Sequence, residues 1–382
     1  MKTNHILQGD CIEELKKLPE KSINMCMTSP PYWALRDYGT ASWDGGDVNC
    51  SHLKNEGFLK WSEKSKLAGT QTQEVYETQR QTYKDVCGRC GAKRVDKQLG
   101  LEPTFDEYIN KLCNVFDEVK RVLRDDGTCW VNIGDTYSSA PTGNKGHIKN
   151  ELFAGSPKGE NYRDNIAQAT RNKPKTKIKN KSLLCIPFRF AIEMVNRGWI
   201  LRNTIIWHKP NCMPSSVKDR FTVDFEYIFF FSKKKKYYFE TQYEPLKEVS
   251  IKRAEYGLNQ TNHKGKAVNV QNLDKMGDRF VNSKGRNKRT TWTIKPKPFK
   301  EAHFAVFPEE LCETPIKAGC PEQGIVLDPF FGAGTTGLVA LKQNKKFIGI
   351  ELNPDYIKIA EARLKPFMEQ EKLPELFMED KK

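Results

Sequence analysis

The stretch that most constrains the fold lies near the end of the sequence, between Ile325 and Leu364. A short apolar run leads into Asp-Pro-Phe-Phe-Gly-Ala-Gly-Thr-Thr-Gly at 328–337, then into residues with helical spacing, and then into a second apolar run at 347–350. The glycines match G-x-G-x-x-G in the strand, turn and helix context that this pattern requires. The stretch therefore predicts one unit of a parallel α/β sheet.

The same alternation recurs along most of the chain. It predicts an α/β fold, with a Rossmann-like, mostly parallel sheet in one large core that carries insertions. The turn at Asp125-Asp126-Gly127 is expected to separate a helix from the strand that follows it. The expected strands are 23–27, 129–133, 200–207, 227–231, 326–327 and 347–350, and the expected helices are 12–18, 104–123 and 187–196. We assign 1–43, 96–240 and 291–365 to the core, 44–95 and 241–290 to insertions, and 366–382 to a frayed tail.

The glycine-rich turn predicts a cofactor site. Glycine lets the backbone approach a ligand at the start of a helix, and Glu351, 23 positions after Asp328, can accept hydrogen bonds from the ribose of an adenosine. NAD would also fit the glycine pattern. However, Asp328 suits a cationic amino group better than a pyrophosphate, and no strands follow to build a second mononucleotide half. If the glycines served packing alone, Glu351 would have no explanation.

The sequence Ser29-Pro30-Pro31-Tyr32 directly follows the strand expected at 23–27. Two prolines form a rigid turn without N–H donors, so backbone carbonyls can be left without an intrachain partner. The Ser29 hydroxyl and the Pro30 carbonyl can accept both hydrogens of an NH₂ group on a planar heterocycle, while Tyr32 stacks on the ring. This would direct the nitrogen lone pair at an electrophilic methyl group. A purely structural Pro-Pro turn would leave the flanking serine and tyrosine unexplained.

Together, TSPPYW at 28–33 and DPFFGAGTTG at 328–337 resemble the amino-methyltransferases of DNA, which make N4-methylcytosine or N6-methyladenine. The catalytic motif precedes the cofactor motif, which is the permuted, β-type order of this family. The resemblance covers about 4–240 and 291–365, apart from the insertion at 44–95. Lesser motifs are matched at 9–10, 131–135, 206–211 and 303–308.

The resemblance implies S-adenosylmethionine as methyl donor, duplex DNA as substrate, and a target base turned out of the helix. Ser29, Pro30, Pro31 and Tyr32 would hold the base, and Asp10 and Trp33 are candidates for its pocket. Transfer would be direct, because the chain lacks the Pro-Cys dipeptide that C5-cytosine enzymes need. The residues implied for the cofactor are Asp328, Phe330, Gly332, Gly334, Thr335 and Glu351, with Asp135 and Phe304 bordering it.

The choice of base depends on Ser29. Within the family, serine at this position accompanies cytosine, whereas adenine enzymes more often carry Asp or Asn, so we expect N4-cytosine with N6-adenine as the alternative. The correlation has no physical derivation, because all three side chains offer an acceptor oxygen. Methylation of RNA or of a protein glutamine amide would suit a similar turn. A non-catalytic DNA-binding protein would not need an intact Ser-Pro-Pro-Tyr.

The polar insertion at 44–95 carries Cys50-Ser51-His52 and, after 34 residues, Cys87-Gly88-Arg89-Cys90. Cys-x-x-Cys followed by glycine is typical of a zinc knuckle, and Cys-x-His would complete a closed Cys₃His site. We therefore predict a structural zinc bound by Cys50, His52, Cys87 and Cys90, with unliganded cysteines as the alternative. Because the insertion follows the catalytic turn, we expect it near the DNA entrance.

The net charge of +15 and pI near 9.2 favour a polyanionic partner, although a lysine-rich composition would give the same values. Residues 251–300 hold thirteen basic residues against three acidic ones. We assign target recognition to 241–290 and phosphate contacts to the basic run at 171–181. Candidates for guanine edges or phosphates are Arg253, Arg279, Arg286 and Arg289, and a solvated basic loop is the alternative.

Eleven cysteines without a signal peptide indicate a reduced, cytoplasmic protein of a bacterial or phage-infected cell. We expect no membrane segment, because no apolar run approaches the roughly 20 residues needed to cross a bilayer. We also expect a monomer or dimer. A cognate restriction endonuclease could exist in the same system without forming a stable complex.

Overall fold

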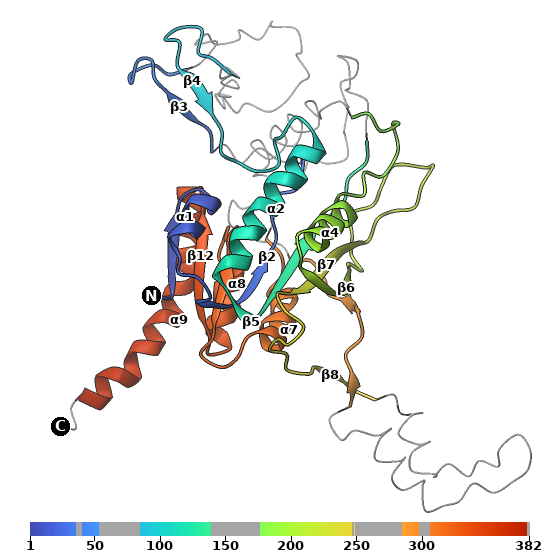
Figure 1. The fold of residues 1–382 in the computed structure, drawn as a ribbon, viewed down its shortest axis with the longest axis vertical. Helices are drawn as coiled ribbons and strands as arrows, with labels where there is room; N and C mark the ends of the chain where they lie inside the picture. The colour runs from blue at the N-terminus through green and yellow to red at the C-terminus, as the bar shows by residue number, and fades with distance from the viewer. Residues whose placement is uncertain are drawn as a thin grey trace, which may run out of the picture. The chain divides into compact units, whose positions relative to one another are not determined.

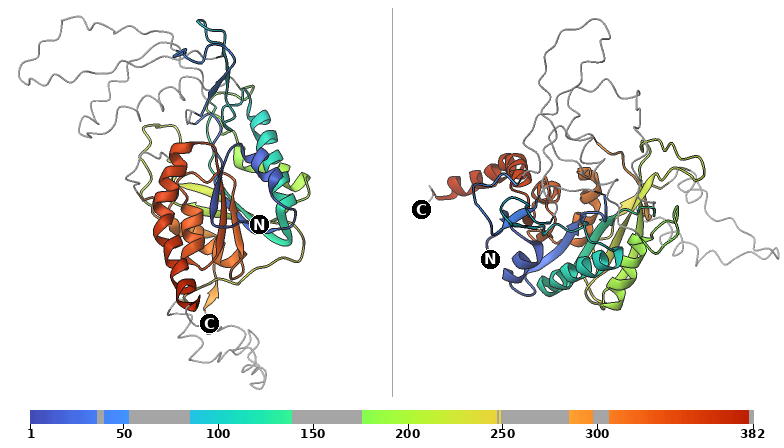
Figure 2. Two further views of the ribbon diagram at one scale, coloured as in Figure 1. Left: turned by 90° about the vertical axis from the view of Figure 1, so that its left-hand side faces the viewer. Right: turned by 90° about the horizontal axis from the view of Figure 1, so that it is seen from above.

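The computed structural model describes residues 1–35, 40–52, 85–138, 176–246, 248, 285–297 and 306–379 (Figures 1 and 2). The chain forms two compact units. One comprises Met1–Arg36 with Leu99–Lys382, and the other comprises Asp37–Gln98 and contains the Cys/His segment.

The larger unit is built on an eight-stranded sheet. Neighbouring strands are parallel except where β7 is involved, so β7 runs against the rest of the described sheet. This confirms the mostly parallel α/β prediction. The strand order is β1(His5–Gln8), β12(Lys346–Glu351), β11(Ile325–Asp328), β2(Ile23–Thr28), β5(Leu123–Ile133), β7(Phe225–Ser232), β6(Ile200–His208) and β10(Thr291–Thr293).

Helices cover both faces of the sheet, as the right-hand view in Figure 2 makes plain. Successive residues of β5 alternate between two apolar clusters: Cys129 and Val131 face one cluster and Trp130 faces the other. This alternation places the sheet between two buried layers. One layer is formed by α1(Cys11–Lys17), α2(Phe105–Val122) and α4(Ile186–Asn196), and the other by α7(Glu309–Gly319), α8(Thr335–Lys342) and α9(Pro354–Glu379).

The helix α2 illustrates why the local prediction succeeded. Thr104 caps its start, because the Thr104 hydroxyl accepts a hydrogen bond from the Glu107 backbone N–H at 3.1 Å. The buried residues recur at helical spacing, among them Tyr108, Leu112 and Phe116. None of the helices within the described ranges is long and apolar enough to cross a membrane.

The arrangement of β11 and β2 positions the candidate site. The two strands are paired, with Val326 opposite Met25, but the chain leaves them in opposite directions. From β11 it passes through α8 to β12, and from β2 it passes through α2 to β5. Such a divergence is a topological switch point, and ligands bind beyond the carboxyl ends of strands at such points.

Two local predictions are wrong. Asp125-Asp126-Gly127 forms a bulge inside β5 instead of a turn before it: Ile23 pairs with Leu123, and Met25 already pairs with Thr128. A Cβ on Gly127 would lie 3.0 Å from the Arg124 carbonyl oxygen and 3.1 Å from that of Asn24, so a side chain there would crowd both carbonyls.

The second correction concerns the tail expected from Pro366. The helix α9 continues to Glu379. Phe367 and Met368 pack against the apolar cluster on the α7 and α8 side. The first residues of the segment that was expected to fray therefore pack against the core as part of α9.

Candidate functional site

The two motifs meet at the switch point through a direct side-chain contact. Thr28 ends β2 and Asp328 ends β11, and the Thr28 hydroxyl donates to Asp328 Oδ1 at 2.5 Å across 300 positions of sequence. Thr336, in the first turn of α8, donates its hydroxyl to Asp328 Oδ2 at 2.7 Å. All three residues are buried. The start of the Ser-Pro-Pro-Tyr turn and the start of the glycine-rich turn are thus hydrogen-bonded to each other.

Asp328, predicted to contact the cofactor, also accepts hydrogen bonds from the protein itself. Its side chain also accepts the Phe330 backbone N–H at 3.0 Å, and the residue is only 1% exposed. Burial raises the pKa of Asp328 to about 6, against the opposing effect of these hydrogen bonds. The sequence suggested that this carboxylate meets a cationic amino group of the cofactor. In the structure the same carboxylate ties the two turns together, and its contact with the cofactor stays a prediction.

Apolar packing of the Phe331 ring fixes the glycine-rich turn. Phe331 lies under the turn with its ring stacked on Phe347 at 5.4 Å, and a Cβ on Gly349 would lie 2.3 Å from the Phe331 ring. Gly332 and Gly334 have φ values of 50° and 77°, which glycine adopts readily. The bulky residue that supports the turn, Phe331, was not singled out from the sequence.

Arg363 of α9 clamps the same turn from another side. Its guanidinium donates to the Ala333 carbonyl and to the Thr335 hydroxyl, the latter at 3.2 Å. Thr335, predicted to contact the cofactor, is buried and takes part in this clamp. Phe330 remains half-buried at the start of the turn.

Glu351 ends β12 beside the glycine-rich turn. Its Oε2 accepts the Gly332 N–H at 2.7 Å and its Oε1 accepts the Asn353 N–H at 2.8 Å. Burial is the largest influence and raises the pKa of Glu351, while these backbone hydrogen bonds oppose it. Because each carboxylate oxygen offers two lone pairs, the group can accept further hydrogen bonds from a diol such as a ribose.

A hydrogen-bond network holds the Ser-Pro-Pro-Tyr corner. The Tyr32 hydroxyl donates to Glu226 Oε2 at 2.7 Å. Asn132 Nδ2 donates to the same oxygen at 3.1 Å, and Ser29 donates its hydroxyl to Asn132 Oδ1 at 3.3 Å. Lys209 Nζ bonds Glu226 Oε1. The network therefore joins residues that follow β2 and β6 with residues of β5 and β7.

Glu226 and Lys209 have site roles that the sequence analysis missed. Lys209 belongs to the stretch 206–211 that resembled a lesser motif, but no role was assigned to it. Glu226 lies just before the apolar run of β7 and belongs to no recognised pattern. Burial, followed by the negative charge of Glu226, raises the pKa of Tyr32 well above its usual value. Tyr32 is therefore a neutral phenol.

Close backbone packing fixes the Pro-Pro turn and the Tyr32 ring. The Pro31 carbonyl accepts the Tyr108 hydroxyl at 2.8 Å, which leaves the Pro30 carbonyl as the candidate for a substrate amine. A Cβ on Gly134 would lie 2.8 Å from Tyr32 Cε2, so the ring rests against the backbone there.

Two residues predicted for the base pocket lie elsewhere. Asp10 caps α1 by accepting the Ile12 and Glu13 N–H groups at 3.0 and 3.1 Å. It follows β1, which β12 and β11 separate from β2. Trp33 is 3% exposed and donates its indole N–H to the Glu102 carbonyl at 3.0 Å, so it is a core residue.

Asp135 lies just beyond the carboxyl end of β5. Its Oδ1 accepts the Thr136 and Ile186 N–H groups at 2.8 and 3.1 Å and so anchors the start of α4. Its Oδ2 is buried and has no hydrogen-bond partner among the described residues, and burial raises the pKa of Asp135. Phe304, the other bordering residue, lies outside the described residues.

The expected DNA-reading arginines divide into two groups. Arg253 and Arg279 lie outside the described residues. The Nε atoms of Arg286 and Arg289 lie 2.8 and 2.6 Å from Glu244 Oε1. Glu244 and Arg286 also pair in the short ladder of β8(Tyr243–Glu244) and β9(Arg286–Asn287). In the structure these two arginines therefore pair with Glu244 and join the two described ends of the 241–290 region.

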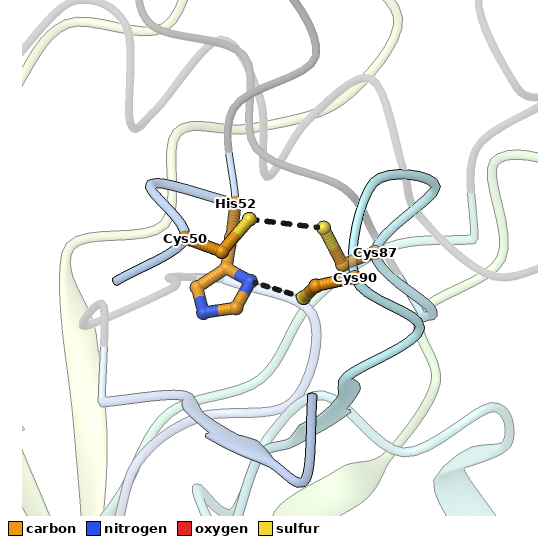
Figure 3. A group of neighbouring side chains, drawn as sticks. All are labelled: Cys50, His52, Cys87 and Cys90. Atoms are coloured by element: carbon orange, nitrogen blue, oxygen red, sulfur yellow. Dashed lines mark hydrogen bonds between the residues drawn. The ribbon is translucent and has the colours of Figure 1, made fainter. Parts of the chain in front are cut away.

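In the smaller unit the structure brings together the four predicted metal ligands (Figure 3). One donor atom from each of Cys50, His52, Cys87 and Cys90 lies within 4.8 Å of every other.

Comparisons with known proteins agree with this architecture. Residues 23–362 match a protein family described as DNA methylase. Type II methyltransferase M.Cfr9I of Citrobacter freundii is 34% identical over 361 residues, which cover 94% of this chain and 87% of that protein. Type II methyltransferase M.SmaI of Serratia marcescens is 33% identical over 365 residues, which cover 94% and 90%.

A solved structure has the same fold. It is the PvuII DNA methyltransferase, described as cytosine-N4-specific, with a TM-score of 0.51 and 18% sequence identity. The match covers 95% of this chain and 86% of that one.

Proposed function

The chain is a member of the DNA methylase family, and we propose that it transfers the methyl group of S-adenosylmethionine to N4 of cytosine in duplex DNA. The hydrogen bond between Thr28 and Asp328 carries this proposal. It joins a turn suited to an amine-bearing base to a turn suited to a nucleoside cofactor. A methyl donor and a methyl acceptor could therefore be held at one sheet edge.

The residues at the glycine-rich turn fit S-adenosylmethionine. Glu351 is the candidate acceptor for the ribose hydroxyls, since its carboxylate ends β12 beside the turn and its two oxygens offer four lone pairs. When bound, this cofactor supplies an electrophilic methyl group. Asp135, whose buried Oδ2 has no hydrogen-bond partner within the described part of the chain, is a candidate acceptor at the same edge.

The Ser-Pro-Pro-Tyr corner would orient the acceptor amine. Because Ser29 donates its proton to Asn132, its oxygen lone pairs remain available to accept one amine hydrogen. The Pro30 carbonyl would accept the other, and the neutral ring of Tyr32 would stack on the base. With the cofactor bound, the amine lone pair held by Ser29 and the Pro30 carbonyl would be directed at the methyl group that the cofactor supplies, and the displaced amine proton would pass to solvent. Much of the rate would come from positioning.

Ser29 supports cytosine over adenine through its association with cytosine in this family, and N6-adenine remains the alternative. Nucleoside mass spectrometry of duplex oligonucleotides methylated by the purified enzyme tests this choice. We expect N4-methylcytosine, and N6-methyladenosine as the sole product would contradict the cytosine assignment. Ser29→Ala should lower turnover, whereas Ser215→Ala, on an exposed segment after β6, serves as the matched control.

The DNA partner is proposed from the family and from the positive charge. We assign target recognition to 241–290, and the type II relatives support a place in a restriction–modification system with a cognate endonuclease. Single-molecule sequencing of DNA from expressing cells would give both the modified base and its sequence context. Methylation of RNA or protein amides, with no transfer to duplex DNA, would contradict the assignment.

A further inference from the structure

The described part of the smaller unit, 40–52 and 85–98, buries very little apolar material. Its described strands, β3(Ser42–Asp44) and β4(Lys93–Val95), pair as a three-residue antiparallel ladder. Among the described residues of the unit, the buried hydrophobic ones are Cys87 and Ala92, whereas Val48 is 95% exposed. A ladder this short is not stable in water without a packed face or another constraint.

Two of the distances between the candidate ligand atoms match those of a tetrahedral metal site, and all four atoms lie within 4.8 Å of one another. Cys50 Sγ and Cys87 Sγ lie 3.8 Å apart, and Cys90 Sγ and His52 Nδ1 lie 3.5 Å apart (Figure 3). With Zn–S of about 2.3 Å and Zn–N of about 2.05 Å, tetrahedral angles require about 3.8 Å between two sulfurs and about 3.5 Å between sulfur and nitrogen. We propose that Cys50, His52, Cys87 and Cys90 bind one zinc ion that holds the Asp37–Gln98 unit together.

The backbone around the ligands is shaped to present them. The Gly91 N–H donates to the Cys87 carbonyl at 2.8 Å, which closes the turn that carries Cys87 and Cys90. Gly46 has a φ of 72°, and a Cβ there would lie 2.8 Å from Cys90 Sγ. Gly46 can therefore approach the Cys90 sulfur this closely only because glycine has no side chain.

The second pair of ligands is also fixed from outside the cluster. The Cys50 N–H donates to the Asp47 carbonyl at 3.0 Å. The His52 ring stacks on Trp43, with centroids 4.4 Å apart and planes 16° apart, which orients the imidazole toward the sulfurs. Ligand orientation by such neighbours is a regular feature of metal sites.

The donor set favours a structural zinc over other uses of these side chains. Three thiolates and one imidazole fill a tetrahedral shell and leave no position for a reacting water. The three cysteines are free, and the Cys50–Cys87 separation of 3.8 Å is well above the roughly 2.05 Å of a disulfide. The zinc is therefore assigned to the folding of this unit and takes no part in methyl transfer.

Metal analysis of the purified full-length protein tests the proposal independently of methylation. We expect one zinc per chain by inductively coupled plasma mass spectrometry. X-ray absorption should show three sulfurs at about 2.3 Å and one nitrogen at about 2.0 Å. Zinc well below one equivalent, together with no tetrahedral cobalt spectrum after loading with Co²⁺, would overturn the proposal.

Substitutions at the proposed ligands provide a second test of the zinc site. Cys87→Ser should lose zinc, whereas Cys212→Ser, which removes a free cysteine of the larger unit, should keep it. His52→Ala should weaken zinc binding at least tenfold, and His52→Cys should restore it with four sulfurs around the metal. If Cys87→Ser kept a full equivalent of zinc, the assigned site would be wrong, whatever the activity of the enzyme.

Discussion

The two corners of the proposed active site are held in place by different interactions. Apolar packing under a short, contiguous turn fixes the glycine-rich corner: the Phe331 ring fills the space that Gly349 leaves open. A polar network fixes the Ser-Pro-Pro-Tyr corner, in which Glu226 joins Tyr32 to Lys209. The first corner should therefore respond to substitution mainly in stability, and the second mainly in activity.

The largest effect is expected from removing the packing of the glycine-rich corner. Phe331→Ala should lower the free energy of unfolding by about 3–5 kcal/mol, because the ring is 3% exposed and leaves a cavity. Denaturant unfolding measures the change. Phe221→Ala, at a side chain that is 95% exposed, is the matched control and should have little effect. Equal decreases in the free energy of unfolding of both variants would contradict the role of Phe331 packing in the glycine-rich corner.

The next prediction concerns Asp328, which links the two corners. Its pKa is raised to about 6 in the folded protein, so its stabilising contribution is present below the unfolded value near 4 and is lost as the pH rises through 6. Asp328→Asn lacks this titration. Relative to the wild type, the variant should gain about 2–3 kcal/mol of stability between pH 4 and pH 7. Unfolding at several pH values measures this difference, and Asp355→Asn, at an exposed side chain, should produce no such trend.

Substitution of Tyr32 tests the Ser-Pro-Pro-Tyr corner separately from the glycine-rich corner. Tyr32→Ala should lower kcat/KM by about thirtyfold, since stacking of an aromatic ring on a base contributes about 2 kcal/mol. Cofactor affinity, measured by calorimetry, should change little. Glu351→Gln should give the opposite result, with weakened cofactor binding. If Tyr32→Ala weakened cofactor binding as strongly as Glu351→Gln does, the two corners would not have separate roles.

The smallest effect is expected at Glu226, which positions Tyr32. Glu226→Gln keeps an acceptor for the Tyr32 hydroxyl but loses the charge that pairs with Lys209. We expect kcat to fall about tenfold, or about 1.4 kcal/mol, with the cofactor KM unchanged. Steady-state kinetics measures both values. Glu20→Gln, at an exposed residue, is the control, and an unchanged kcat in Glu226→Gln would remove Glu226 from the site.

The contrast between the corners also explains what the sequence could predict. The glycine-rich turn, its flanking strands and Glu351 lie within one short stretch of sequence. Local sequence patterns were therefore sufficient to predict the strand, turn and helix there. The network around Tyr32 joins side chains from four strands or strand ends, and Glu226 carries no local signal because only the pairing of β7 with β5 and β6 brings it to the site.

The errors have a related cause. Asp10 and Trp33 lie next to recognisable motifs, but adjacency in sequence does not determine where a side chain points. Asp10 follows an outer strand, and Trp33 turns into the core. The bulge at Asp125-Asp126-Gly127 has the composition of a turn and was predicted as one.

A crystal structure of the enzyme with S-adenosylhomocysteine and duplex DNA tests most directly whether the two corners form one active site. The account predicts the ribose on the Glu351 carboxylate and an extruded cytosine against Tyr32, with its N4 amine between Ser29 and the Pro30 carbonyl. A cofactor bound away from the edge shared by β11 and β2, or a base that does not contact Tyr32, would contradict it.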